Sequence, residues 1–193
     1  MGPEPSYPIK RLHRLRQNKP LRLLIQENQL SVSNLIYPMF VTYGTNKKKE
    51  IGPMPGCYQF SIDKLLEELS DIYGLGIPGI LLFGIPDYKD DLGRGAYAKD
   101  GIIQTSIRKI KDRFPDLLII SDVCLCEYTN HGHCGLLKDS KINNDETLTL
   151  LAQAALSHAQ SGADIVAPSA MMDGQVHTIR NILDSNGYTQ TPI

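Results

Sequence analysis

The strongest constraint on the fold is an alternation, from Leu35 onward, of short apolar runs with amphipathic stretches. The runs are rich in Ile, Leu and Val, are bounded by Gly, Pro or polar residues, and span residues 35–41, 78–84, 117–125 and 163–167. This alternation is typical of βα units that feed a parallel sheet. Because each run is apolar almost throughout, we expect both faces of the sheet to be covered.

The stretches between and after these runs predict helices, because their apolar residues recur every three or four positions. Ser61, Asn143 or Asn144, and Asp173 are the expected N-caps, and Gly162 and Gly187 are the expected ends of the last two helices. The predicted buried faces are Leu65, Leu69 and Ile72; Ile103, Ile107, Ile110 and Phe114; Leu148, Leu151, Ala155 and Ala159; and Val176, Ile179 and Leu183.

The predicted fold class is α/β, a TIM (β/α)8 barrel with an N-terminal arm, of which about the first four βα units are present. Such a barrel takes roughly 250 residues, and residues 188–193 read as a loop leading into a fifth strand. A doubly wound sheet is the alternative, since four or five strands suffice for it. We expect residues 1–34 to form an extended arm and residues 35–193 to form the N-terminal half of the barrel.

Within the arm, the segment Arg11 to Arg16 is basic and has Leu at every third position. This pattern suits a chain lying on another surface better than a free-standing helix. A solvated basic tail is the alternative.

The charge balance argues against nucleic acid, membranes and polyanionic partners, because 20 Lys and Arg face 21 Asp and Glu. No apolar run approaches the roughly 20 residues of a membrane span, and residues 1–10 lack the apolar stretch of a secretory signal. We therefore expect a cytoplasmic protein with a small ligand.

Three of the four cysteines, Cys124, Cys126 and Cys134, crowd into one segment where the third strand passes into its loop. The C-terminal strand ends of a barrel carry its active site. Residues two apart on an extended strand point the same way, so Cys124 and Cys126 can face one metal. Gly132 and Gly135 let the loop bring Cys134 around as a third thiolate.

Three thiolates suit zinc and leave a fourth position for water or substrate, which is typical of a catalytic site. His131 or His133 could instead take that position and close the site. Buried cysteines packing as small apolar groups are a further alternative, whereas a redox pair is disfavoured because no Cys-x-x-Cys motif is present. Asp122 shares the strand face of Cys124 and is either functional or a salt-bridge partner or cap.

The run Asp122 to Gly135 is similar to the metal-binding segment of the zinc-dependent porphobilinogen synthases, also called 5-aminolevulinate dehydratases. The resemblance spans nearly the whole chain in the right order. It includes Arg11 to Arg16, Ile36 to Val41, Met54-Pro55-Gly56, Lys89-Asp90-Asp91 with Gly101, Ala167-Pro168-Ser169 and Met172-Asp173-Gly174.

The resemblance implies a lyase of tetrapyrrole (heme) biosynthesis that condenses two molecules of 5-aminolevulinate to porphobilinogen with loss of water. It implies Zn²⁺ held by Cys124, Cys126 and Cys134, and a substrate pocket that includes Asp122 and Ser169. It also implies an arm that embraces a neighbouring subunit in a homo-oligomer, usually an octamer. Some members bind a regulatory Mg²⁺, whose ligands this segment does not identify.

Two departures from the family pattern bear on activity. Ala170 and Gln175 stand where many relatives carry an acidic residue and an arginine, a choice that some bacterial members share. The two Schiff-base lysines of the family are expected after Ile193, so no catalytic residue of that kind lies in this chain, and we expect the chain alone to be inactive. Alternatives are a non-catalytic zinc-binding or assembly module and another barrel aldolase or dehydratase of the same fold.

Overall fold

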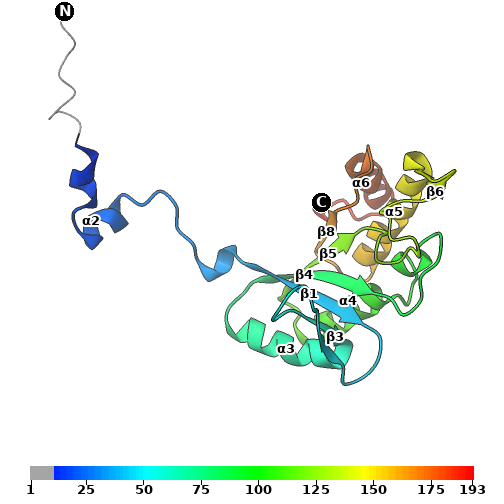
Figure 1. Cartoon of the computed structure of the whole chain (residues 1–193), viewed down its shortest axis with the longest axis horizontal. Coiled ribbons are helices and arrows are strands. Elements are labelled where there is room, and N and C mark those ends of the chain that lie inside the picture. The colour runs from blue at the N-terminus through cyan, green and yellow to red at the C-terminus, as the bar shows by residue number, and fades with distance from the viewer. Residues whose placement is uncertain (1–10) are drawn as a thin grey trace, which may run out of the picture. The chain divides into compact units, whose positions relative to one another are not determined.

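The computed structural model of the chain describes residues 11–193 (Figure 1). It divides into two units with a boundary between Asn34 and Leu35. The second unit contains the sheet, the hydrophobic core and all the candidate site residues. None of the described helices is both long enough and apolar enough to cross a bilayer.

The core of the second unit is a parallel sheet whose main strands follow one another in chain order. These strands are β1 (Ile36–Thr42), β4 (Gly79–Ile85), β5 (Leu118–Val123) and β8 (Ile165–Pro168). Each pairs in parallel with the next, with Tyr37 opposite Ile80 and Ile120 opposite Ile165, for example. The four predicted strand positions are confirmed, with ends that differ by one or two residues.

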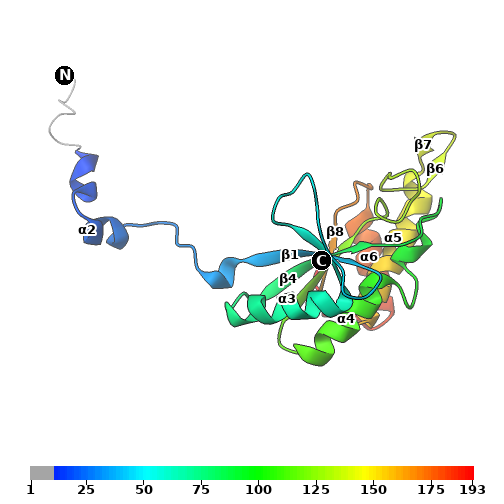
Figure 2. The same cartoon turned by 60° about the horizontal axis from the view of Figure 1, so that its bottom comes forward.

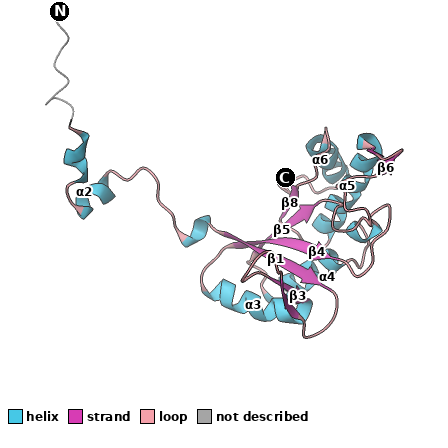
Figure 3. Ribbon diagram, viewed as in Figure 1, coloured by secondary structure: helices cyan, strands magenta, loops and turns pink. Residues whose placement is uncertain are grey.

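Four helices follow these strands: α3 (Ile62–Gly74), α4 (Ile102–Arg113), α5 (Asn144–Gln160) and α6 (Gln175–Ser185). Each contacts the next along the chain, and in Figures 2 and 3 they line one side of the sheet. A doubly wound sheet has helices on both faces. The sequential strand order with one helical layer therefore favours the barrel-type arrangement over the doubly wound alternative.

The helix faces follow the predicted spacing with one exception. Leu65, Ile107, Leu151 and Ile179 are fully buried in the core, whereas Val176 is 54% exposed because it lies in the first turn of α6, beside the loop. Asn143 caps α5 by accepting a hydrogen bond from the Glu146 amide, as predicted.

The predicted Asp173 cap is wrong. Gly174 occupies the N-cap position of α6 in a left-handed conformation, and the Asp173 amide donates to the Asn144 side chain instead. Ser61 does occupy the N-cap position of α3 but makes no capping hydrogen bond, because its hydroxyl accepts from the Lys47 amide. Asn144 thus contacts the backbone of Asp173, and the excursion before α3 takes up the Ser61 hydroxyl.

Only the helix-facing side of the sheet is fully covered within the described residues. Met39, Val41 and Leu82 on that side are buried, whereas Phe40 and Phe83 on the other side are partly exposed and stack on each other with ring centroids 5.1 Å apart. The expectation that both faces are covered is therefore wrong for this segment. The strands are apolar on both faces because the inner face of a barrel is also a packing surface.

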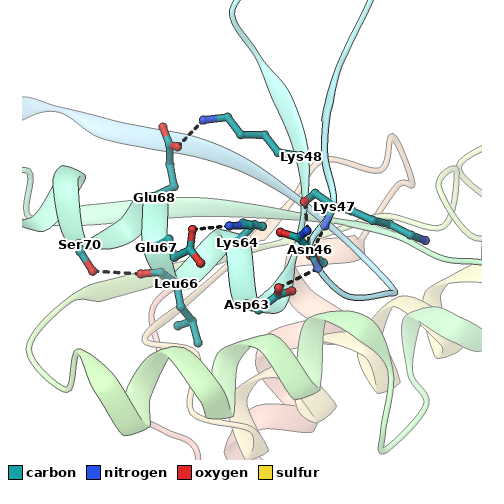
Figure 4. Close-up of polar contacts among 10 residues, drawn as sticks. Asn46, Lys47, Lys48, Asp63, Lys64, Leu66, Glu67, Glu68 and Ser70 are labelled. Carbon is teal, nitrogen blue, oxygen red and sulfur yellow. Dashed lines mark hydrogen bonds and ion pairs between the residues drawn. The ribbon is translucent and has the colours of Figure 1, made fainter.

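An unpredicted excursion between β1 and α3 adds β2 (Lys48–Glu50) and β3 (Tyr58–Ser61) beside β1. Polar contacts fix it to α3: the Asn46 amide donates to Asp63 at 2.7 Å, and Lys48 pairs with Glu68 at 2.9 Å (Figure 4). The Lys48 ammonium also lies 4.8 Å from the centre of the Tyr58 ring. Such short strands carry little periodicity, which is why the sequence did not reveal them.

The first unit, described from Arg11, contains short helical segments: a 3-10 helix at Leu12–Arg16, the helix α2 at Lys19–Leu24 and a 3-10 turn at Val32–Asn34. The segment expected to lie on another surface is a short 3-10 helix, and its contact with such a surface stays a prediction. A spacing of three brings side chains onto one line in a 3-10 helix, which accounts for the Leu12 and Leu15 pattern.

The last described residues lie beside the edge of β8. The Pro192 carbonyl accepts a hydrogen bond from the Val166 amide at 3.2 Å. Tyr188 to Ile193 form no assigned strand, so a fifth strand after residue 187 stays a prediction.

Candidate metal centre

The three clustered cysteines lie on the loop that follows β5, and the strand ends earlier than the sequence suggested. β5 stops at Val123, and a tight turn follows in which the amides of Tyr128 and Thr129 both donate to the Leu125 carbonyl. The extended-strand explanation for the pairing of Cys124 and Cys126 is therefore wrong. Their sulfurs meet because the chain turns, which also brings the Cys126 amide to 3.5 Å from the Cys124 sulfur.

The structure brings all three predicted sulfur ligands together. The Sγ atoms of Cys124 and Cys126 are 3.3 Å apart, and the sulfurs of Cys124, Cys126 and Cys134 all lie within 4.8 Å of one another. Tetrahedral zinc with Zn–S bonds of about 2.3 Å requires sulfurs roughly 3.8 Å apart. The sulfur positions fit that requirement after small side-chain adjustments, so the donor set suits a thiolate-bound zinc ion.

Neither neighbouring histidine belongs to this cluster. Among residues 11–193, the three cysteines are the one group of three or more His, Cys, Asp or Glu ligand atoms close enough to share an ion. The ring centres of His131 and His133 lie 5.5 Å apart, and the Nδ1 atom of His131 accepts from the His133 amide. In this structure no histidine nitrogen thus joins the sulfur cluster, and the described residues offer no comparable acidic cluster for magnesium.

The sulfur cluster is partly shielded from water, because Cys124 is buried and Cys126 and Cys134 are half-buried, and this shielding affects the protonation of the thiols. Burial raises the pKa of the Cys124 thiol to about 11, and burial together with the neighbouring Cys124 and Glu127 raises the pKa of Cys126. The Cys126 sulfur lies 3.2 Å from a carboxylate oxygen of Glu127. Thiols in such surroundings stay protonated until a cation replaces their protons, since a metal binds the thiolate form.

Asp122 and Ser169, the two predicted substrate-pocket residues, come from neighbouring strands and lie together. Asp122 pairs with Ala167 in the sheet, and the Ser169 amide donates to the Val123 carbonyl at the same edge. Burial raises the pKa of Asp122 to about 6, whereas a hydrogen bond with Ser169 opposes this rise. The sheet therefore gathers a shielded carboxyl group, a hydroxyl group and three thiols at the carboxyl ends of β5 and β8.

The two departures from the family pattern lie beside this edge. Ala170 is buried, and Gln175 folds back so that its side-chain amide group reaches the Pro168 carbonyl and the Met172 amide, each at 3.4 Å. Gln175 thus stabilises the loop that carries Ser169 through two hydrogen bonds to its backbone.

The sequence did not identify the residues that support the cysteine loop from outside it. Three glycines, Gly84, Gly93 and Gly95, lie against Tyr128. A Cβ atom at Gly84 would lie 2.4 Å from the Tyr128 hydroxyl oxygen. Glycines after a strand were the available signal, but it takes the fold to show which side chain occupies the space.

The parallel sheet in chain order, the single helical layer and the thiol cluster at the carboxyl strand ends are the features of part of a (βα) barrel with a candidate metal site. The sequence profile of one family, Delta-aminolevulinic acid dehydratase, matches residues 9–193. The chain belongs to this family, whose members are also known as porphobilinogen synthases.

Relatives in several bacteria are about half identical to this chain over the residues that align. The Delta-aminolevulinic acid dehydratases of Halalkalibacterium halodurans and Bacillus subtilis are 50% and 48% identical to it over 96% and 97% of its length, which is 56% and 58% of theirs. That of Ruminiclostridium josui is 46% identical over 96% of this chain and 90% of its own length. The chain thus spans little more than half the length of most of these relatives.

A solved structure supports the same assignment at the level of the fold. The crystal structure of delta-aminolevulinic acid dehydratase from Toxoplasma gondii, in complex with the reaction product porphobilinogen, superposes with a TM-score of 0.91 at 38% sequence identity. The match covers 95% of this chain and 53% of that one. The four βα units therefore correspond to part of the barrel of that enzyme.

Proposed function

We propose that this chain supplies the metal centre and part of the substrate pocket of a porphobilinogen synthase, which condenses two molecules of 5-aminolevulinate with loss of water. The observation that carries the proposal is the meeting of three thiols within 4.8 Å of one another at the strand edge that also holds Asp122 and Ser169. The reaction itself is inferred from membership of the family.

Cys124, Cys126 and Cys134 would hold the Zn²⁺ ion, which when bound supplies a Lewis acid for a carbonyl oxygen. The protein's own contribution is positional. Asp122, partly shielded from water and beside Ser169, is placed to orient an amino group of the substrate or to pass a proton. The partial burial of this edge strengthens each polar contact that the substrate makes there.

The Schiff-base lysines of the family, expected after Ile193, are the complementary part of the reaction. We therefore propose that the 193-residue chain binds zinc tightly but does not form porphobilinogen by itself. Zinc content of the reduced, purified chain and a porphobilinogen assay test both statements. Stoichiometric zinc without product is the expected result, whereas a metal-free chain under zinc-replete conditions overturns the proposed metal centre.

The first unit supports a second role, assembly into a homo-oligomer, with an octamer as the size that the family resemblance implies. Large apolar side chains are exposed along its described part, residues 11–34, which is unusual for a surface left in water. The exposed residues are Leu12, Leu15, Leu23, Leu24, Ile25, Leu30 and Val32. Light scattering of the chain and of a variant with Leu23→Ser and Leu24→Ser tests this role: the variant should be monomeric and should still bind zinc.

A further inference from the structure

The loop after β4 and the cysteine loop after β5 are joined by a short parallel bridge. Asp90 pairs with Thr129: the Asp90 amide donates to the Tyr128 carbonyl, and the Asn130 amide donates to the Asp90 carbonyl, each at 3.2 Å. A side-chain hydrogen bond from Asn130 to the Asp91 carboxylate closes the same junction. The cysteine loop is thus attached to a neighbouring strand's loop midway between Cys126 and Cys134.

The loop after β4 is itself rigid at this point. Asp90 accepts hydrogen bonds from the amides of Leu92 and Arg94 and pairs with the Arg94 guanidinium at 3.1 Å. Gly93 adopts a positive φ of 60° and lies against Thr129 and Tyr128, so a side chain there is unfavourable. The junction therefore has a fixed surface on which the cysteine loop rests.

Tyr128 anchors the other side of the loop by insertion into the protein. It is 5% exposed, and its ring and hydroxyl fill the space above Gly84 and Gly95. Because closely packed interiors resist displacement, this insertion fixes the backbone just after Cys126. The Thr129 hydroxyl then donates to the His133 carbonyl at 2.9 Å and directs the chain back toward Cys134.

We infer that the loop after β4 is the template that holds the three thiols in a metal-binding arrangement, with Tyr128, Asn130 and Asp91 as positioning residues. The inference rests on the proposed zinc site. None of these three residues offers a ligand atom to the sulfur cluster. Their effect is to remove loop conformations in which Cys134 lies away from Cys124 and Cys126, so that less ordering is left for the metal to impose.

The test is a double-mutant cycle on the exposed pair, Asn130→Ala and Asp91→Ala, in the full 193-residue chain. The readouts are zinc affinity from chelator competition and the cobalt-thiolate absorption bands of the Co²⁺-loaded chain. Each single variant should bind zinc about 10-fold more weakly, the range typical of residues that support metal ligands. The double variant should be little weaker than either single one, because both remove the same contact.

Tyr128→Phe and Tyr128→Ala extend the test into the interior. The Phe variant keeps the ring and should retain zinc affinity and the cobalt bands, whereas the Ala variant should lose affinity further than the surface variants. If the Ala variant does not fold, the surface pair alone decides the question. Asp116→Ala and Asn181→Ala are matched controls, since both residues are exposed and lie outside this junction.

Each outcome separates the inference from the proposed function. If the unaltered chain binds no zinc, the metal centre is refuted. If the unaltered chain binds zinc and the Asn130 and Asp91 variants bind it equally well with unchanged cobalt bands, the template is refuted and the metal centre stands. Equal weakening in the control variants also refutes the template, because it assigns the effect to general stability.

Discussion

Polar residues of β5 belong to two clusters on opposite faces of the sheet. The two clusters differ in how far the protein encloses them. Asp122 faces the inner side with Ser169 and precedes the sulfur cluster. Its neighbour Ser121 faces the helices, where its hydroxyl lies 3.1 Å from the Nδ1 atom of the fully buried His158 on α5. Adjacent residues of a strand point to opposite faces, so one step along the chain separates the two environments.

The helix-side cluster is enclosed by the protein's own groups. Gln104 on α4 is fully buried and donates to the Ala96 carbonyl and the Ser157 hydroxyl, each at 2.8 Å. Two side-chain atoms of the helix-side cluster, the Nε2 of His158 and the Oε1 of Gln104, have no hydrogen-bond partner among residues 11–193. This cluster is sealed between helices and sheet, whereas the sulfur cluster lies at a strand edge. The comparison teaches that position at the carboxyl edge, rather than buried polarity, distinguishes the candidate functional site.

The largest expected effect is a loss of zinc affinity when a cysteine of the sulfur cluster is replaced. Cys124→Ser should weaken zinc binding by about two orders of magnitude or more, because a hydroxyl is a poor substitute for a thiolate ligand. Chelator competition measures the change, and circular dichroism should show an unaltered fold. Retained affinity in this variant would break the distinction between the two clusters.

The converse variant is His158→Ala, which should destabilise the fold without affecting the metal. Removing a fully buried ring leaves a cavity and the Ser121 hydroxyl without its partner, at a cost of about 2–4 kcal/mol. Urea unfolding of the metal-free chain measures this loss. Zinc affinity well below the unfolding transition should match that of the unaltered chain, and a large drop would show that the two faces are coupled.

A pH series sharpens the same contrast. Burial lowers the pKa of His158 from its usual 6.5 to about 4. Between these two pKa values, His158 binds a proton in the unfolded chain but stays neutral in the folded chain. This contribution to stability is fully present above about pH 6.5 and declines toward pH 4 by up to about 1.4 kcal/mol per pH unit.

Asp122 contributes to stability with the opposite pH dependence over an overlapping pH range, since its pKa is raised to about 6. The difference between the unaltered chain and His158→Gln isolates the histidine. The free energy of unfolding of the His158→Gln variant should fall less steeply on acidification from pH 6.5 to pH 4 than that of the unaltered chain. His177→Gln, at an exposed position on α6, is the matched control and should follow the unaltered profile.

The smallest expected effect comes from Ser121→Ala, one residue away from Asp122. Loss of the hydrogen bond to His158 should lower the free energy of unfolding by about 1 kcal/mol. Thermal unfolding measures the change, and zinc affinity should be unaffected because this side chain faces the helices. A metal defect in this variant would indicate that the two faces of β5 do not act independently.

Much of the fold and of the candidate site could be predicted because it depends on local periodicity and on residue type. Apolar runs gave the four main strands, and spacings such as Leu65 to Leu69 gave buried helix faces that the structure confirms. Errors arose where a local pattern had more than one physical solution. Asp173 could cap α6 by residue type, yet Gly174 takes the N-cap position in a left-handed conformation.

By itself the sequence determined which residues could bind a metal, because thiolate chemistry and the βα pattern are both local. Tertiary structure alone decided how those residues meet. The turn after Val123, the support of Tyr128 by three glycines and the bridge to Asp90 all depend on segments that are distant in the chain. Contacts between distant segments follow from packing and register, which no local pattern of residues encodes.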